Sequence, residues 1–163
     1  MPAPPAETPP AWTVSVDPLT WALSFAHVQV ERRLTPRLSL YVGPSLHLYD
    51  GLVPDTQGPW RGYGAEAGLR WFFRPGAPRG AWLMARGVLG WVTTEQATLP
   101  EGGTGHAAGL GGYTSGLVGY TAILGPGLVL SGGVGVSWFD YGVAQWGIHG
   151  PLPAAHTAVG WAF

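Results

Sequence analysis

The feature that most constrains the fold is a strict alternation of large apolar residues with small ones. Residues 157–163 read Thr-Ala-Val-Gly-Trp-Ala-Phe, with a bulky or β-branched side chain at every second position. Successive side chains of a strand point to opposite faces of a sheet, so a period of two predicts a strand with one apolar and one compact face. Residues 37–49, 61–74 and 127–141 alternate in the same way. These segments predict an all-β protein.

Composition indicates which kind of β protein this is. Only 10% of the 163 residues are charged, against about 25% in a typical soluble domain. No segment holds about 20 consecutive apolar residues, which excludes a transmembrane helix. Backbone groups in lipid must be paired within the protein, so a membrane chain made of strands must form a closed barrel. The composition therefore predicts a transmembrane β-barrel, and the net charge of −1 gives no reason to expect nucleic-acid binding.

Turn signals divide the chain into eight predicted strands. Short turns lie at 35–36, 74–80 and 125–127, and longer polar or glycine-rich stretches lie at 50–60, 95–108 and 142–153. Membrane barrels alternate short and long connections in this way, with the short turns at the periplasmic end. The predicted strands are residues 11–17, 22–33, 37–49, 61–74, 80–94, 109–124, 127–141 and 154–163. An even number of antiparallel, up-and-down strands places both chain ends at the short-turn end.

The N-terminal part carries three expectations. Residues 1–10 contain five prolines, which predict a disordered or polyproline-like lead before a single barrel domain at 11–163. No signal peptide is visible, and we expect one to have been removed. The first strand is predicted to turn at Asp17-Pro18 into the second, and one irregular strand that merges the two is the alternative.

Alternation alone does not say which face of the wall points inward. A soluble lipocalin-like barrel would have its apolar face inside. The compact face here is mostly glycine, serine and alanine, which suits the narrow interior of an eight-stranded barrel and would be a poorly soluble surface in water. The apolar face is therefore predicted to meet lipid. Its aromatic residues near strand ends predict two interfacial girdles: Tyr63, Trp71, Phe73, Trp91 and Trp138.

Four charged residues fall on the inward-facing positions of the predicted strands: Glu31, Glu66, Arg70 and Arg86. The turn near Ala77 sets position 68 opposite Arg86, which places Arg86 diagonally between Glu66 and Arg70, and Glu31 could reach Arg70 across the lumen. Buried charges must be paired. We predict a salt-bridge network that plugs the barrel, with a proton or ion path or a catalytic carboxylate as the alternatives.

Charges outside the interior are predicted to separate between the two ends. Acidic residues fall at or near the long-loop end, and most arginines fall near the short-turn end. The acidic set is Asp17, Asp50, Asp55, Glu95, Glu101 and Asp140, and the basic set is Arg32, Arg33, Arg37, Arg74 and Arg79. The tendency of charges to avoid lipid accounts for both sets. Divalent-cation bridging outside and anchoring at the inner rim are the alternatives.

A hydrolytic site is conceivable at Ser45 and His47, which are two residues apart on one strand and share a face. A nucleophilic serine needs a histidine within hydrogen-bond reach, oriented by a third polar group. The predicted parity places the pair inside the barrel, whereas barrel lipid hydrolases act on the lipid-facing wall. The other histidines show no metal-ligand spacing, so neither a metal nor a cofactor is predicted.

The chain resembles the small OmpA-like and OmpX-like outer-membrane barrels in its eight strands, short inner turns and terminal phenylalanine. It is similar above all to a group of uncharacterised outer-membrane barrels, in which an early strand ends in an acid–Arg pair before a tight turn. Here that segment is Val28-Gln29-Val30-Glu31-Arg32-Arg33-Leu34-Thr35-Pro36, followed by Arg37-Leu38-Ser39-Leu40-Tyr41-Val42-Gly43. The resemblance implies a bacterial outer-membrane location and carries over no catalytic residues.

The resemblance also implies partners. Outer-membrane lipid would surround the barrel, and the barrel-assembly machinery would recognise the C-terminal strand at Val159, Trp161 and Phe163. The predicted protein is a monomer with a structural or interaction role exerted through its outer loops, and without catalysis. A lipid hydrolase that uses Ser45 and His47, a narrow channel and a soluble lipocalin-like binder are the alternative hypotheses.

Overall fold

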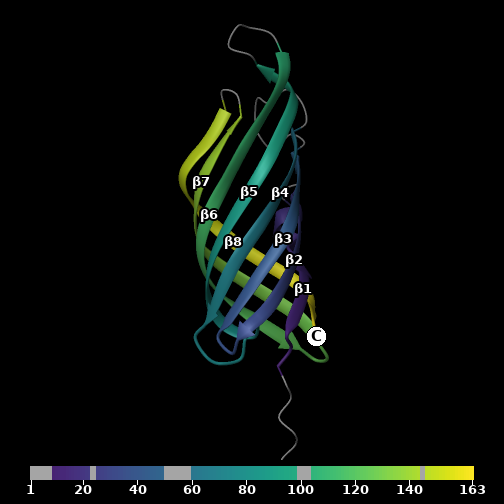
Figure 1. The fold of residues 1–163 in the computed structure, drawn as a ribbon, viewed down its shortest axis with the longest axis vertical. Helices are drawn as coiled ribbons and strands as arrows, with labels where there is room; N and C mark the ends of the chain where they lie inside the picture. The colour runs from purple at the N-terminus through teal and green to yellow at the C-terminus, as the bar shows by residue number, and fades with distance from the viewer. Residues whose placement is uncertain (1–8, 23–24, 50–59, 99–103, 144–145) are drawn as a thin grey trace, which may run out of the picture.

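The computed structural model describes residues 9–22, 25–49, 60–98, 104–143 and 146–163 (Figure 1). One antiparallel sheet contains all eight strands in chain order, and a one-turn helix, α1 (Pro18–Ala22), follows the first strand. The strands are β1 (Trp12–Val16), β2 (Phe25–Thr35), β3 (Leu38–Tyr49), β4 (Trp60–Phe72), β5 (Gly80–Thr98), β6 (Thr104–Leu124), β7 (Leu128–Val143) and β8 (Trp146–Ala162). The predicted eight-stranded antiparallel all-β fold is confirmed. Within the described ranges, no helix is long and apolar enough to cross a bilayer.

The sheet closes on itself because β1 pairs with both β2 and β8, which makes a closed barrel. Thr13 of β1 pairs with Ala162 of β8. The pairing can also be followed the other way around the barrel, from Thr13 through each directly paired residue on β2 to β7. This path reaches Leu152 of β8, which lies ten residues before Ala162 (162 − 152). This stagger requires tilted strands. A row of paired residues therefore climbs toward the long-loop end as it passes from β1 to β8.

The first strand begins and the last strand ends at the short-turn end, and the β4–β5 turn closes that end. The backbone N–H groups of Ala11 and Trp12 donate to the carbonyl of Phe163 at 3.1 and 3.0 Å, as predicted from the even strand number. The β4–β5 turn folds against the β2–β3 turn, because Gly76 and Ala77 both donate to the Pro36 carbonyl, at 2.8 and 3.0 Å. These bonds hold the turn over the end of the barrel.

Two predicted loops are largely strand. β5 and β6 continue to Thr98 and Thr104, and β7 and β8 continue to Val143 and Trp146, so the predictions of loops at 95–108 and 142–153 are wrong. Both hairpins rise above the rest of the wall in Figure 1. Pro151 and Pro153 are compatible with β8 because β1 pairs with β8 only at residues 159–162, which leaves these prolines on an unpaired edge where no N–H is needed. The third predicted loop, 50–60, lies outside the described residues apart from Trp60, which begins β4.

The chain turns at Asp17-Pro18 as predicted, but it does so through the helical turn α1 rather than directly into the second strand. The Asp17 carboxylate accepts hydrogen bonds from the backbone N–H groups of Leu19 at 3.0 Å and Thr20 at 3.3 Å. Aspartate is a preferred N-cap, and proline is favoured at the first helical position. The second strand consequently begins at Phe25 rather than at residue 22.

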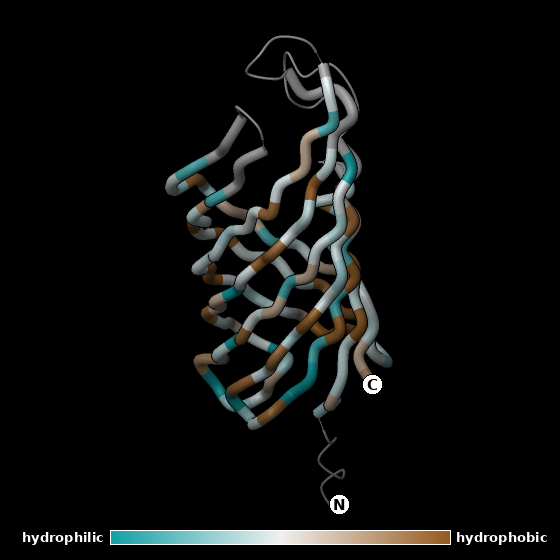
Figure 2. The backbone as a smooth tube through the Cα atoms, turned by 45° about the horizontal axis from the view of Figure 1, so that its top comes forward, coloured by the Kyte–Doolittle hydropathy of each residue, from teal (hydrophilic) through white to brown (hydrophobic). Residues whose placement is uncertain are grey.

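The apolar strand faces point outward, as predicted. Brown and pale segments alternate along the strands in Figure 2. On β4, Tyr63 is 68% exposed and Leu69 is 47% exposed. Glu66, which lies between them, is 3% exposed, and Arg70, which follows Leu69, is 2% exposed. The same alternation gives exposed apolar residues on every strand. Examples are Val14, Val28, Val42, Leu83, Leu110, Val136 and Val159.

A small apolar cluster fills the barrel at the short-turn end. It consists of Tyr41, Phe72, Ala77, Trp82, Met84 and Leu117. Trp82 is fully buried, and a Cβ atom at Gly119 or Gly133 would overlap its ring. The small residues of the inner face therefore make room for a few large side chains, which is how a narrow barrel is filled without voids.

Candidate functional site: the charged interior

The interior charges lie on neighbouring strands because the strand register brings them together. Gly68 of β4 pairs with Arg86 of β5, the register that the sequence predicted. On the other side of Gly68, Tyr41 of β3 pairs with both Gly68 and Glu31. A Cβ at position 68 would overlap the Tyr41 ring, so glycine lets this ring lie across the wall between the charged residues.

Arg70 is the centre of the cluster nearer the short-turn end. Its Nη1 atom lies 2.6 Å from Glu31 Oε2, and its Nη2 atom lies 2.6 Å from His156 Nε2. The guanidinium carbon stands 5.2 Å from the centroid of Tyr41 and 5.0 Å from that of Trp82. Arg70 therefore joins β2 to β8 across the lumen while the two rings contact its faces, an arrangement that favours a desolvated cation.

Glu31 is held by more than its arginine. The Ser39 hydroxyl donates to Oε1, and the Thr13 hydroxyl donates to Oε2 at 3.5 Å. A buried carboxylate is stable only when its lone pairs are occupied in this way. The two hydroxyls come from β1 and β3, so the carboxylate also links three adjacent strands.

Asp17 continues the same cluster. Its carboxylate accepts a hydrogen bond from the Thr157 hydroxyl and lies 3.7 Å from His156 Nδ1. Asp17 is 1% exposed, which contradicts its predicted position among the acidic residues of the long-loop end. Asp17 shares the inward parity of the buried residues Thr13 and Ser15, and after only five residues β1 has not yet reached the long-loop end. Asp17 therefore lies inside the barrel.

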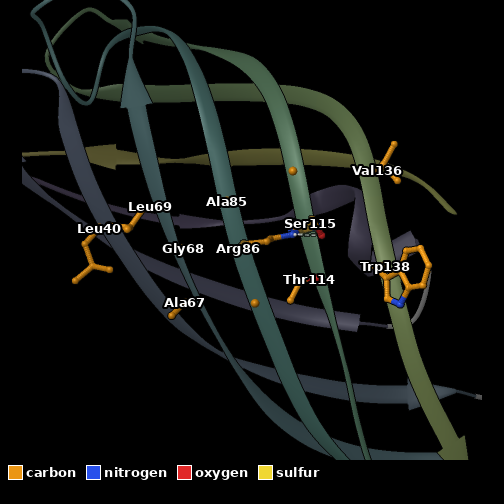
Figure 3. A pocket seen from close by; sticks show the side chains of 12 residues that line it. Leu40, Ala67, Gly68, Leu69, Ala85, Arg86, Thr114, Ser115, Val136 and Trp138 are labelled. Carbon is orange, nitrogen blue, oxygen red and sulfur yellow. Dashed lines mark hydrogen bonds between the residues drawn. The ribbon is translucent and has the colours of Figure 1, made fainter. Parts of the chain in front are cut away.

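Glu66 is the centre of a second cluster, nearer the long-loop end. Gln29 Nε2 donates to Oε1 at 2.8 Å, and the other oxygen lies 3.3 Å from His27 Nδ1 and 3.9 Å from Arg86 Nη1. Arg86 Nε donates to the Ser115 hydroxyl at 3.3 Å, the contact drawn in Figure 3. On the next strand, β7, the Ser137 hydroxyl shares a hydrogen bond of 2.6 Å with the Ser115 hydroxyl.

The structure brings the four predicted charges together in two clusters rather than one network. Arg70 contacts Glu31, and Arg86 lies beside Glu66. Sequence reasoning missed three members, Asp17, His27 and His156. The spacing of the two histidines indicates no metal site, and only their inward parity could have indicated a place in the interior. Their partners come from strands far apart in sequence, so pairing rules for adjacent strands could not reveal them.

The chemistry of these clusters is mutual compensation of charge. Each buried carboxylate has a cationic or imidazole neighbour within 4 Å. Among the described residues, no group of three or more His, Cys, Asp or Glu residues could hold a metal ion. Side chains that contact one another across the lumen link separate strands. Such contacts suit an interior that is filled by side chains.

Ser45 lies inside the barrel, opposite His27 in the β2–β3 ladder, and is 4% exposed. The side chain of His47 lies outside the described residues, so the proposed Ser45–His47 contact is not addressed by the structure.

The outer wall carries the predicted aromatic and C-terminal residues. All five residues of the predicted girdles are exposed, as are Val159, Trp161 and Phe163. A groove on this wall has Leu40 and Leu69 on one side and Val136 and Trp138 on the other, with small residues between them (Figure 3). The Arg86 side chain extends toward Ser115, to which it donates a hydrogen bond.

Comparisons with protein-family models, with curated proteins and with solved structures find no match for this chain.

Proposed function

We propose that this protein is an integral β-barrel of a bacterial outer membrane, with a plugged polar interior and a structural or interaction role exerted through its loops. One observation carries the proposal: the strands present apolar side chains outward and charged side chains inward. A monomeric soluble protein rarely exposes a continuous apolar patch larger than a few hundred Å². A lipid-facing wall requires such a surface, together with a sheet that closes on itself, as this sheet does through the pairing of β1 with β8.

The aromatic residues support the same proposal through their levels on the wall. Trp71 and Phe73 lie at the short-turn end of β4, and the centroids of their rings are 5.2 Å apart. Tyr63 pairs with Trp91 near the long-loop end. Trp138 is on β7, and the upward climb of paired rows brings it toward that same level. Two levels of exposed aromatic side chains fit the two headgroup regions of a bilayer.

The proposed partners are outer-membrane lipid and, during insertion, the barrel-assembly machinery. β8 closes the barrel because its residues 159–162 pair with β1. The assembly machinery would therefore recognise the outward residues of the strand whose pairing completes the barrel. The OmpA-like resemblance adds a monomeric state to this proposal.

Heat modifiability tests the proposal. The purified chain, refolded in detergent or in phospholipid vesicles, should migrate faster on a gel when unboiled than when boiled, and carbonate washing should leave it in the membrane fraction. A monomer that stays folded in water without detergent or lipid would contradict the proposal.

We do not extend the proposal to lipid hydrolysis or to a pore. Ser45 faces the interior, away from a surface that lipid acyl chains would reach. The Arg70 side chain reaches His156 across the lumen, and the Arg86 side chain lies beside Glu66 of the neighbouring strand. An eight-stranded barrel leaves little space beside such groups.

A further inference from the structure

Most basic residues of the chain gather at the short-turn end. The sequence contains no lysine and eight arginines, five of which lie on β2, on the β2–β3 turn and on the β4–β5 turn. We call these five the arginine rim: Arg32, Arg33, Arg37, Arg74 and Arg79. Four of them are exposed, and Arg33 is partly buried.

The arginine rim occupies one side of the barrel end. The turn that carries Arg37 and the turn that carries Arg74 and Arg79 are bound to each other by backbone hydrogen bonds, including one of 2.8 Å from Phe72 N–H to the Arg37 carbonyl. The β6–β7 turn at 125–127 has no basic residue. The positive charge is therefore concentrated over two adjacent turns rather than spread around the end.

The rim has no acidic partner within the part of the chain that the structure describes. The ion pairs found there involve Arg70, Arg86 and three histidines, and none involves a rim arginine. Five cations held close together repel one another, so an external anion would lower the energy of this surface.

Arg32 indicates where that anion would lie. Its position on β2 faces outward, and its guanidinium stands 5.1 Å from the centroid of the exposed Trp12 ring. Trp12 belongs to the same outer wall as Trp71 and Phe73. An anion bound by Arg32 would therefore sit at the border between the apolar belt and water.

We propose that the arginine rim binds the phosphate groups of anionic phospholipids in the inner leaflet, an inference that rests on the proposed membrane location. Guanidinium groups bind phosphate oxygens in a bidentate manner, whereas a lysine would act as a point charge. A phospholipid fits better than a free phosphate because its acyl chains would lie along the apolar belt directly beside Arg32. The rim thereby fixes the depth and direction of the barrel in the bilayer.

The test measures lipid preference at the barrel surface. The full chain is inserted into phosphatidylcholine vesicles that contain brominated phosphatidylglycerol or brominated phosphatidylcholine, and tryptophan quenching gives their relative association constants. We expect the parent to prefer phosphatidylglycerol, and Arg32→Gln or Arg74→Gln to reduce that preference about fivefold each. Arg61→Gln, which removes an exposed arginine at the long-loop end, is the matched control and should change it less. High salt should weaken the preference in the parent.

Three outcomes would separate the claims. An equal effect of Arg61→Gln and Arg74→Gln would overturn the rim as a site and leave only a general charge effect. Normal insertion without any phosphatidylglycerol preference would overturn lipid binding while the proposed membrane location stands. Failure of the parent chain to insert into either kind of vesicle would overturn the proposed function itself.

Discussion

The inner and outer faces of the same strands differ as much as the core and surface of a soluble protein, but in the reverse sense. On β4, Leu69 and Trp71 are exposed, and Arg70 between them is buried against Glu31. In a soluble barrel the apolar side chains would fill the interior and the charges would face water. On this strand the interior side chains are held by specific polar contacts, whereas the apolar side chains of the outer face remain exposed.

The largest expected effect comes from breaking the interior. Arg70→Met leaves Glu31 buried without its cation, which should lower the free energy of unfolding by about 3–5 kcal/mol. Urea unfolding of the vesicle-inserted barrel, followed by tryptophan fluorescence, measures this change. The double variant Glu31→Gln/Arg70→Met should recover much of the loss. A double variant no more stable than Arg70→Met would show that the pairing of charges is not what Arg70 provides.

A charge placed on the outer face sharpens the comparison from the other side. Leu69→Arg should cost about 2–4 kcal/mol in a bilayer, where a charged side chain leaves water. Tyr63→Arg is the matched variant near the long-loop end and should cost about 0–1 kcal/mol. The same urea titration in vesicles compares the two. Equal and negligible costs would mean that the outer face is in contact with water.

A smaller effect distinguishes two glycines of β6 that face opposite sides. Gly119→Ala introduces a Cβ atom that overlaps Trp82, whereas Gly116→Ala projects into open space on the outer face. Overpacking should cost Gly119→Ala about 1–3 kcal/mol. Gly116→Ala should stay within about 0.5 kcal/mol of the parent. Similar stabilities of the two variants, by thermal unfolding in detergent, would argue against a tightly filled interior.

The smallest expected change in stability is that of Phe163→Ala. The Phe163 side chain is 65% exposed on the outer wall, and its backbone bonds to Ala11 and Trp12 do not depend on the side chain. We predict slower assembly into membranes with nearly unchanged unfolding of the assembled barrel, as measured by the rate at which the heat-modifiable form appears. Equal assembly rates of the variant and the parent would remove the assembly-signal prediction.

Alternation and the short turns predicted the strand order and the Gly68–Arg86 register. The small residues of the compact face, together with the aromatic residues near strand ends, predicted that the apolar face points outward. These patterns could not predict which charges meet across the lumen. The contact between Arg70 and His156 depends on the stagger of the closed sheet, which no local pattern encodes. The Asp17 cap was readable from the Asp-Pro pair, but the same pair also favours a turn. The predicted loop at 142–153 contains Pro151 and Pro153, which are compatible with a strand here only because β1 ends too early to pair with them. Nothing in the sequence reveals where β1 stops pairing.

The central claim is that odd-numbered residues of β4 face lipid, and the absence of cysteine makes a direct test possible. Single cysteines at Tyr63, Ala65, Ala67, Leu69 and Trp71 would each carry a nitroxide spin label in the vesicle-inserted barrel. Collision with oxygen, which concentrates in lipid, should rise toward the middle of this series, and collision with a water-soluble nickel chelate should fall there. High collision with the nickel chelate at all five positions would contradict the account.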